Sequence, residues 1–169
     1  MPNYKLNELD HIEREKIISF LTSSPVGVLA VVDTEGNPHA STIYFSVDKE
    51  LNITFTTKRD TFKYKNLSKH DAIMLVAFDA SKQMAVQISG RAKKVTDPET
   101  AHTIYQGTLR AVKKTGEDVV PPIAKIAAGP YVAFTIHPTF VQLSEYGWGD
   151  NFANALKHAN DPNRTGDPA

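Results

Sequence analysis

The side chains best suited to bind an anion are concentrated in one short segment, residues 58–69. This segment holds five cations and the single acid Asp60, although the 19 Lys and Arg of the whole chain balance its 19 Asp and Glu; the cations are Lys58, Arg59, Lys63, Lys65 and Lys69. Thr57 and Thr61 add hydroxyl donors. Such residues, placed where a strand leads into a helix, suit a phosphate, because a helix start also offers unpaired N–H groups.

Two features favour a simpler interpretation of the same segment. A run of charges most often marks a solvated helix surface. Asp60 is also a typical helix N-cap, and its carboxylate would compete with a phosphate for the same N–H groups. From charge alone, a solvated basic surface therefore stays the alternative to a phosphate site.

The elements that must position this segment are mostly strands. Six runs of apolar and β-branched residues, separated by turn residues roughly every 8–12 positions, predict antiparallel strands; they span 26–32, 39–47, 51–57, 73–78, 85–95 and 131–143. Consecutive strands lack the long crossovers that a parallel sheet requires. The sequence thus predicts a mainly β fold, a closed or partly open barrel with flanking helices, because closure removes exposed strand edges.

Helices are expected at three places around these strands. Residues 7–23 form the first, with an apolar stripe that comprises Leu9, Ile12, Ile17, Phe20 and Leu21. A short helix is expected over 60–69. Asp97 as the cap and Pro98 at the first helical position start a helix that ends near Lys114. Residues 117–130, which contain two adjacent prolines, are expected to form a loop.

The composition fits one domain and excludes several kinds of site. The 169 residues suit a single domain over 1–150, followed by a polar tail at 151–169. The absence of cysteine excludes disulfides and thiolate metal sites, and the spacing of the six histidines predicts no metal site. Zero net charge argues against a nucleic-acid partner. No apolar run is long enough to span a bilayer, so we expect a cytoplasmic protein without a membrane partner.

Several motifs, in their order along the chain, resemble one family. The pattern Thr57-x-x-x-Thr61-x-Lys63-x-x-Asn66-Leu67 follows a strand, with Gly36-Asn37-Pro38 before it and Ser89-Gly90-Arg91 after it. Over residues 18–146 the chain is similar to the pyridoxamine 5′-phosphate oxidase-like superfamily, the FMN-binding split barrels. The resemblance implies a six-stranded antiparallel Greek-key split barrel, and a homodimer with FMN in the clefts at the subunit interface.

The resemblance also implies which residues contact the cofactor. Thr57, Thr61 and Lys63 fall on positions that contact the FMN phosphate and ribityl chain, and the neighbouring Thr56 and Lys58 are expected to contribute. A stretch of the second strand would lie along the isoalloxazine ring; it consists of Ser41, Thr42, Ile43 and Tyr44. Trp148 lies between two glycines and could stack on a flavin, although a packing role is at least as well supported by its type.

Three positions depart from the pattern of pyridoxamine-phosphate oxidases. Ser41 and Phe62 stand where those enzymes have arginines, and Ala85 stands where they have a glutamine. Their C-terminal Trp- and Arg-containing substrate segment also has no counterpart after Leu143. We therefore do not expect pyridoxamine phosphate to be the substrate.

The sequence thus predicts an FMN-binding flavoprotein, an oxidoreductase acting on a small-molecule substrate. No residue can be assigned as a general acid or base. Two alternatives stay open: a non-catalytic flavin-binding or general-stress protein, and a split barrel that binds F420 or haem.

Overall fold

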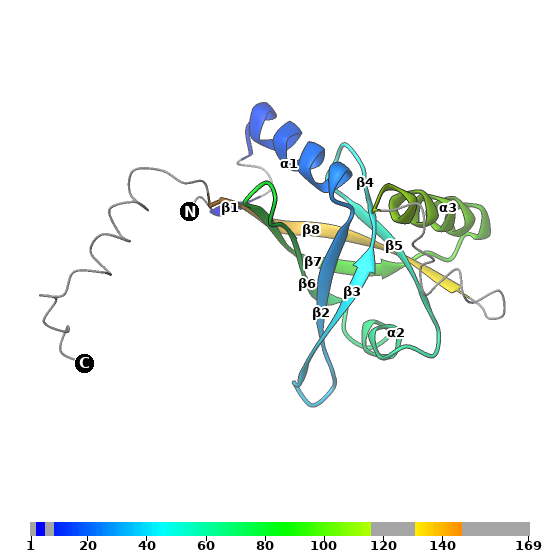
Figure 1. Cartoon of the computed structure of the whole chain (residues 1–169). Coiled ribbons are helices and arrows are strands. Elements are labelled where there is room, and N and C mark those ends of the chain that lie inside the picture. Colours follow the sequence, from blue (N-terminus) through cyan, green and yellow to red (C-terminus); the bar gives the residue numbers. More distant parts are fainter. Residues whose placement is uncertain (1–2, 6–8, 116–130, 147–169) are drawn as a thin grey trace, which may run out of the picture.

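The computed structural model describes residues 3–5, 9–115 and 131–146 (Figure 1). Its strands are all antiparallel, in the order β3-β2-β6-β7-β8-β5-β4, with β1 added on β8. Their bounds are β1 Asn3–Lys5, β2 Val26–Val32, β3 Pro38–Tyr44, β4 Ser46–Val47, β5 Ile53–Lys58, β6 Ala72–Asp79, β7 Met84–Lys94 and β8 Tyr131–Glu145. The predicted split barrel is confirmed. Where six strands were expected, the structure adds β1 and divides the second predicted strand into β3 and β4.

The segment 38–47 curls the sheet into a barrel. Its first part, β3, pairs with β2 at one end of the strand order, and its last part, β4, pairs with β5 at the other end. Phe45 separates the two; it is fully buried, and its N–H donates to the carbonyl of Pro25 at 3.1 Å. Because β3 pairs only with β2 among the described strands, its other edge is the split of the barrel.

The barrel interior is filled by alternating side chains of the strands. Leu29 of β2 and Leu75 of β6 are fully buried partners in the same ladder, while Val28 and Met74 of these strands point outward. On the other side of the barrel, Phe55 of β5 stacks on Phe134 of β8, with ring centroids 5.5 Å apart. This packing holds β5 in place, and with it the turn that follows the strand and leads into α2.

Within the described residues, three helices flank the barrel: α1 His11–Ser23, α2 Phe62–Leu67 and α3 Pro98–Thr115. Asp10 caps α1 by accepting from the Glu13 N–H at 2.8 Å, and the Glu13 carboxylate accepts from the Asp10 N–H. The predicted start at residue 7 was too early. Ile12 was expected in the apolar stripe but is 77% exposed, because the packed face of α1 begins at Ile17.

The third helix covers the barrel beside β4 and β5 (Figure 1). The prediction of Asp97 as its cap is confirmed, since this carboxylate accepts from the Thr100 N–H at 2.8 Å and from the Thr100 hydroxyl at 2.6 Å. These bonds, the hydroxyl first, lower the pKa of Asp97. The expected loop at 117–130 and tail at 151–169 lie outside the described residues.

Candidate cofactor site

The basic segment leaves β5 through a tight turn and enters α2. The Thr61 N–H donates to the carbonyl of Lys58 at 3.4 Å, and Thr61 then caps the helix by accepting from the Tyr64 N–H at 3.3 Å. The prediction that Asp60 caps this helix was wrong, because the turn puts Thr61 in extended conformation directly before Phe62. The exposed Asp60 carboxylate therefore does not take the N-cap position, and the helix is shorter than predicted.

Thr57 and Thr61 form an ordered pair of hydroxyls at this turn. Their Oγ1 atoms are 3.0 Å apart, and the Thr61 hydroxyl donates to the Lys58 carbonyl at 2.9 Å. Because that bond uses the single hydroxyl hydrogen of Thr61, Thr57 is the donor within the pair. Thr57 itself is 4% exposed, so the pair lies at the inner wall of the turn.

Lys63 differs from the other cations of the segment in its surroundings. It is half-buried, and this burial lowers the pKa of its ammonium group. Within the part of the chain that the structure describes, no carboxylate or hydrogen-bond acceptor contacts its Nζ. Lys58 is also half-buried, whereas Arg59, Lys65 and Lys69 are exposed. Among the described residues, Lys63 is thus a partly desolvated positive charge without a counter-ion, which is the environment that an anion improves.

The split edge of β3 lies close to this turn. Helix α2 approaches both β2 and β3, and the Phe62 ring of α2 lies 4.3 Å from the ring of His39 on β3. The His39 Nε2 in turn lies 3.2 Å from a carboxylate oxygen of Asp33. The sequence did not associate these side chains, because they are far apart in the chain and only the packing of α2 joins them.

Residues 41–44 were predicted to lie along the isoalloxazine ring. Their backbone groups lie along one edge of β3, but their side chains do not form one surface. Ser41 and Ile43 point to one face of β3 and Thr42 and Tyr44 to the other, as the alternation of a strand requires. Thr42 is exposed and Ile43 is buried. A flat group held here would therefore contact N–H and C=O groups along the split, next to the turn that carries Lys63.

One predicted residue of the described ranges does not join this site. Thr56 lies on the face of β5 opposite Thr57; it is 8% exposed, and its hydroxyl has no partner among the described residues. Trp148 lies outside the described residues, so its predicted role stays a prediction. The structure brings together Thr57, Thr61, Lys63, the backbone of Lys58 and the split edge of β3.

Two kinds of feature are missing from the described ranges. Residues 3–5, 9–115 and 131–146 contain no cluster of three or more side chains that could hold a metal ion. None of the helices in these ranges is both long enough and apolar enough to cross a bilayer.

The sequence profile of the pyridoxamine 5′-phosphate oxidase family matches residues 14–144. The chain belongs to this family. The resemblance inferred from the sequence is thereby confirmed. The matched range includes the whole segment 57–69 and the strands β2 to β7, so every described part of the candidate site lies in the portion common to the pyridoxamine 5′-phosphate oxidase family.

Relatives within this fold carry different names. The chain is 27% identical over 114 residues to a 5a,11a-dehydrotetracycline/5a,11a-dehydrooxytetracycline reductase from Streptomyces rimosus subsp. rimosus, covering 65% of this chain and 71% of that protein. An F420 reductase of known structure is 25% identical, with a TM-score of 0.57, covering 75% of this chain and 94% of that one. A pyridoxamine 5′-phosphate oxidase-related, FMN-binding protein from Nostoc punctiforme is 14% identical, with a TM-score of 0.56, covering 81% of this chain and 85% of that one. This last likeness shows the fold alone.

Proposed function

We propose that this chain binds FMN at the turn between β5 and α2 and acts as an oxidoreductase on a small organic molecule. The observation that carries the proposal is the Lys63 ammonium, which is half-buried and has no counter-ion among the described residues. A phosphate dianion at this position would restore the charged state that burial disfavours. The FMN-binding relative from Nostoc punctiforme is consistent with this choice of cofactor.

The residues present fit each part of the cofactor. Lys63 would neutralise the phosphate, and the hydroxyls of Thr57 and Thr61, 3.0 Å apart, would turn to donate to it or to the ribityl chain in place of the bonds they make to each other and to the Lys58 carbonyl. The helix dipole contributes little, because α2 has only six residues. The split edge of β3 at residues 41–44 would orient the ring through backbone groups. Bound flavin supplies the hydride and electron transfer, and the chain supplies binding and orientation.

We further propose that a second copy of the chain covers the outer face of β2 and β6. This face carries apolar side chains that are exposed in the single chain: Val28 at 45%, Val32 at 42%, Met74 at 37% and Phe78 at 54%. The two strands pair directly, so these side chains form one patch and not scattered points. An apolar patch on a sheet face is typical of a protein interface. A homodimer through this patch would place the cofactor site at the subunit interface, as expected from the family.

Size-exclusion chromatography with light scattering tests the dimer. We expect the parent chain to run as a dimer and Phe78→Glu to run as a monomer, because a charge would be buried in the interface. Ile12→Glu is the matched control, since Ile12 is also exposed but lies on α1, away from the patch. A monomeric parent chain, or a dimer that survives Phe78→Glu, would contradict the proposed interface.

F420 is the second candidate cofactor, and the 25% identity to an F420 reductase favours it specifically. An anionic tail could use the same lysine and hydroxyls, so the residues of the turn do not separate the two cofactors. The mass of the bound molecule does separate them. A yellow preparation with flavin absorbance and a bound mass matching FMN supports the first proposal, and a bound mass matching F420 supports the second, whereas a Soret band would indicate haem, the other alternative from the sequence.

Titration and anaerobic reduction complete the test. We expect added FMN to bind with saturation, and NADH or NADPH to bleach the bound flavin within a turnover time if the protein is an oxidoreductase. Saturable binding without bleaching by either donor would favour a flavin-storage or stress-response role. Saturable binding of F420 without binding of FMN would make F420 the cofactor in place of FMN. If neither cofactor binds, the proposed function is wrong.

A further inference from the structure

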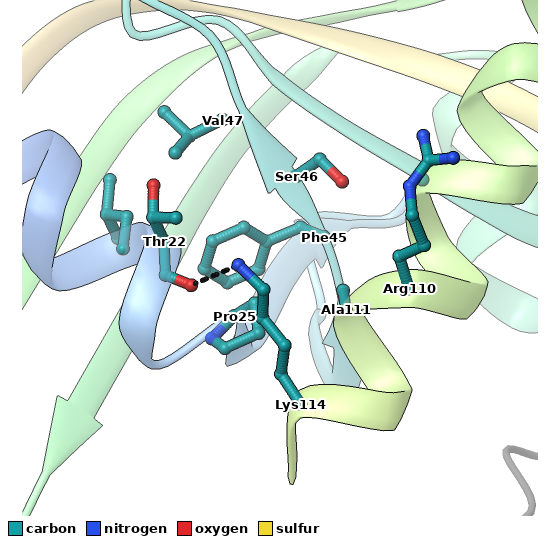
Figure 2. Close-up of a pocket in the computed structure, with 10 residues that line it drawn as sticks. Thr22, Pro25, Phe45, Ser46, Val47, Arg110, Ala111 and Lys114 are labelled. Carbon is teal, nitrogen blue, oxygen red and sulfur yellow. Dashed lines mark hydrogen bonds between the residues drawn. The ribbon is translucent and has the colours of Figure 1, made fainter.

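A cavity lies at the other end of the strand that borders the candidate cofactor site. It encloses about 270 Å³ between the end of α1, β4 and α3 (Figure 2). The segment 38–47 links the two places, because residues 41–44 follow the split and Phe45 and Ser46 continue into the cavity wall. Neither the family nor the proposed function assigns an occupant to this cavity.

The floor of the cavity is apolar and its wall is fixed. Leu21, Pro25, Phe45 and Ala111 are buried and supply the apolar surface. At one side, α3 packs against β4 so closely that a Cβ on Gly107 would lie 3.1 Å from the Ser46 Oγ. The backbone of α3 therefore forms part of the wall, and the Ser46 hydroxyl points toward that helix (Figure 2).

The opening carries two positive charges and no acid. Arg110 and Lys114 line it from successive turns of α3, and none of the ten lining residues is Asp or Glu. Lys114 Nζ donates to the Thr22 carbonyl at 3.4 Å, a long bond that spans the opening (Figure 2). Arg110 has no partner in the described ranges. Figure 2 shows the Arg110 guanidinium and the Lys114 ammonium pointing to different sides, so Lys114, which reaches across to Thr22, is the group that could pair with a carboxylate, and Arg110 adds positive charge at the rim.

The volume limits the apolar part of the ligand. A cavity of about 150 Å³ is known to accept benzene, and sites for drug-sized molecules begin at about 300 Å³. The 270 Å³ found here lies between these values. We infer that this cavity binds a small monocarboxylate whose apolar body is about one six-membered ring, with its carboxylate at Lys114 and with the positive charge of Arg110 adding to the attraction.

This ligand would lie at the opposite end of the segment 38–47 from the residues proposed to face the flavin ring, and its binding to the cavity does not rest on the proposed function. Its apolar body would contact Phe45 and Pro25, and Ser46 would be the nearest polar group on β4. A carboxylate at the opening would also replace the long bond between Lys114 and Thr22.

Benzoate is the probe, and benzamide is the neutral control of the same shape. Binding is measured on the full chain by two-dimensional amide NMR titration, with Ser46 and Ala111 as reporters. We expect saturable benzoate binding, at least tenfold weaker benzamide binding, and at least tenfold weaker benzoate binding in the double variant Arg110→Ala/Lys114→Ala. Lys113→Ala is the matched control, since this exposed cation of α3 does not line the cavity, and it should bind benzoate as the parent does.

Three results would overturn the inference: no saturable benzoate binding, equal affinity for benzamide, or unchanged affinity in the double variant. Ala111→Phe, which fills the cavity, is a second check and should abolish binding while the circular dichroism spectrum stays that of a folded barrel. The same titration with and without FMN separates the two proposals. If the chain binds benzoate but no flavin, only the proposed function is contradicted. If it binds flavin but no benzoate, only the proposed carboxylate site in the cavity is contradicted.

Discussion

Two lysines of this chain, Lys63 and Lys82, meet opposite surroundings. Lys82, in the turn between β6 and β7, lies 3.1 Å from a carboxylate oxygen of Asp79 and donates to the hydroxyls of Ser23 and Ser24 at 2.8 and 3.1 Å. All three ammonium hydrogens of Lys82 are therefore used within the protein. Lys63, on α2, is half-buried and has no such partner in the described ranges.

The difference separates a structural charge from one available to a ligand. Lys82 ties the end of α1 to the β6–β7 turn, and its side chain remains 40% exposed, so desolvation is small. For Lys63, burial disfavours the charge, and none of the described residues compensates it. A protein can retain such a group at little net cost when a ligand supplies the missing anion. The four changes below test this comparison, beginning with the largest expected effect.

Lys63→Ala should weaken FMN binding by about 10- to 150-fold, because a hydrogen bond to a charged group contributes about 1.5–3 kcal/mol. Fluorescence titration of FMN measures the change. Lys65→Ala is the control, since Lys65 is an exposed cation on the same helix and should leave the affinity within about twofold. Equal effects of the two variants would mean that the segment acts through its overall charge, and the comparison with Lys82 would lose its basis.

Thr61→Ala should lower the free energy of unfolding by about 1 kcal/mol, because the variant loses the N-cap of α2. It should also weaken FMN binding, since the hydroxyl pair with Thr57 is lost. Urea denaturation and FMN titration measure the two effects. Thr61→Ser retains the hydroxyl and should stay close to the parent in both; a Ser variant as weak as the Ala variant would assign the effect to the methyl group.

Asp79→Asn should destabilise the protein in a pH-dependent way without changing FMN affinity at pH 7. The Ser81 hydroxyl, and after it the Ser24 hydroxyl and Lys82, hold the pKa of Asp79 far below its ordinary value of 3.8. A carboxylate with a depressed folded-state pKa contributes stability that is fully present above the unfolded pKa and is lost as the pH falls through the folded pKa. The parent should therefore have the higher melting temperature at pH 7, and the difference should shrink steadily below about pH 4. A constant difference between pH 7 and pH 3 would contradict this origin.

Lys82→Met should have the smallest effect, a decrease of at most a few degrees in melting temperature, because exposed ion pairs contribute little. The effect should diminish in high salt, which screens the pair with Asp79. FMN affinity should not change. A loss of flavin binding in Lys82→Met would show that the two lysines do not divide into a structural and a ligand-binding group.

Most of the fold could be predicted because its signals are local. Alternation and turn residues placed β2, β6 and β7 within one or two residues of their observed bounds. The strand predicted over 51–57 is β5, and it begins at Ile53 and not at 51. Leu51 takes a left-handed φ of 67° while its side chain is fully buried, so it belongs to the turn before the strand. The break at Phe45 was missed because it depends on two different partners, β2 and β5, and strand propensity does not encode which partner is near.

The candidate site could be predicted by residue type but not by surroundings. Thr57, Thr61 and Lys63 lie at the turn out of β5, and the sequence named them through the family's motif, so their role in binding stays a prediction. Charge alone did not rank the five cations; the structure shows Lys58 and Lys63 half-buried and Arg59, Lys65 and Lys69 exposed. The sequence also could not predict that Thr61 and not Asp60 caps α2. Both residue types cap helices, and the position at which β5 ends decides between them.

The single stretch of backbone from Pro38 to Val47 has a consequence for regulation. One end of it borders the proposed flavin ring and the other forms part of the cavity wall at Ser46, with only Phe45 anchored between them. Because the two ends belong to one short segment, a displacement of Ser46 would also shift the neighbouring residues 41–44. A molecule that moves Ser46 would therefore change the affinity for the flavin. Thermodynamic reciprocity then requires the flavin to change the affinity for that molecule by the same factor.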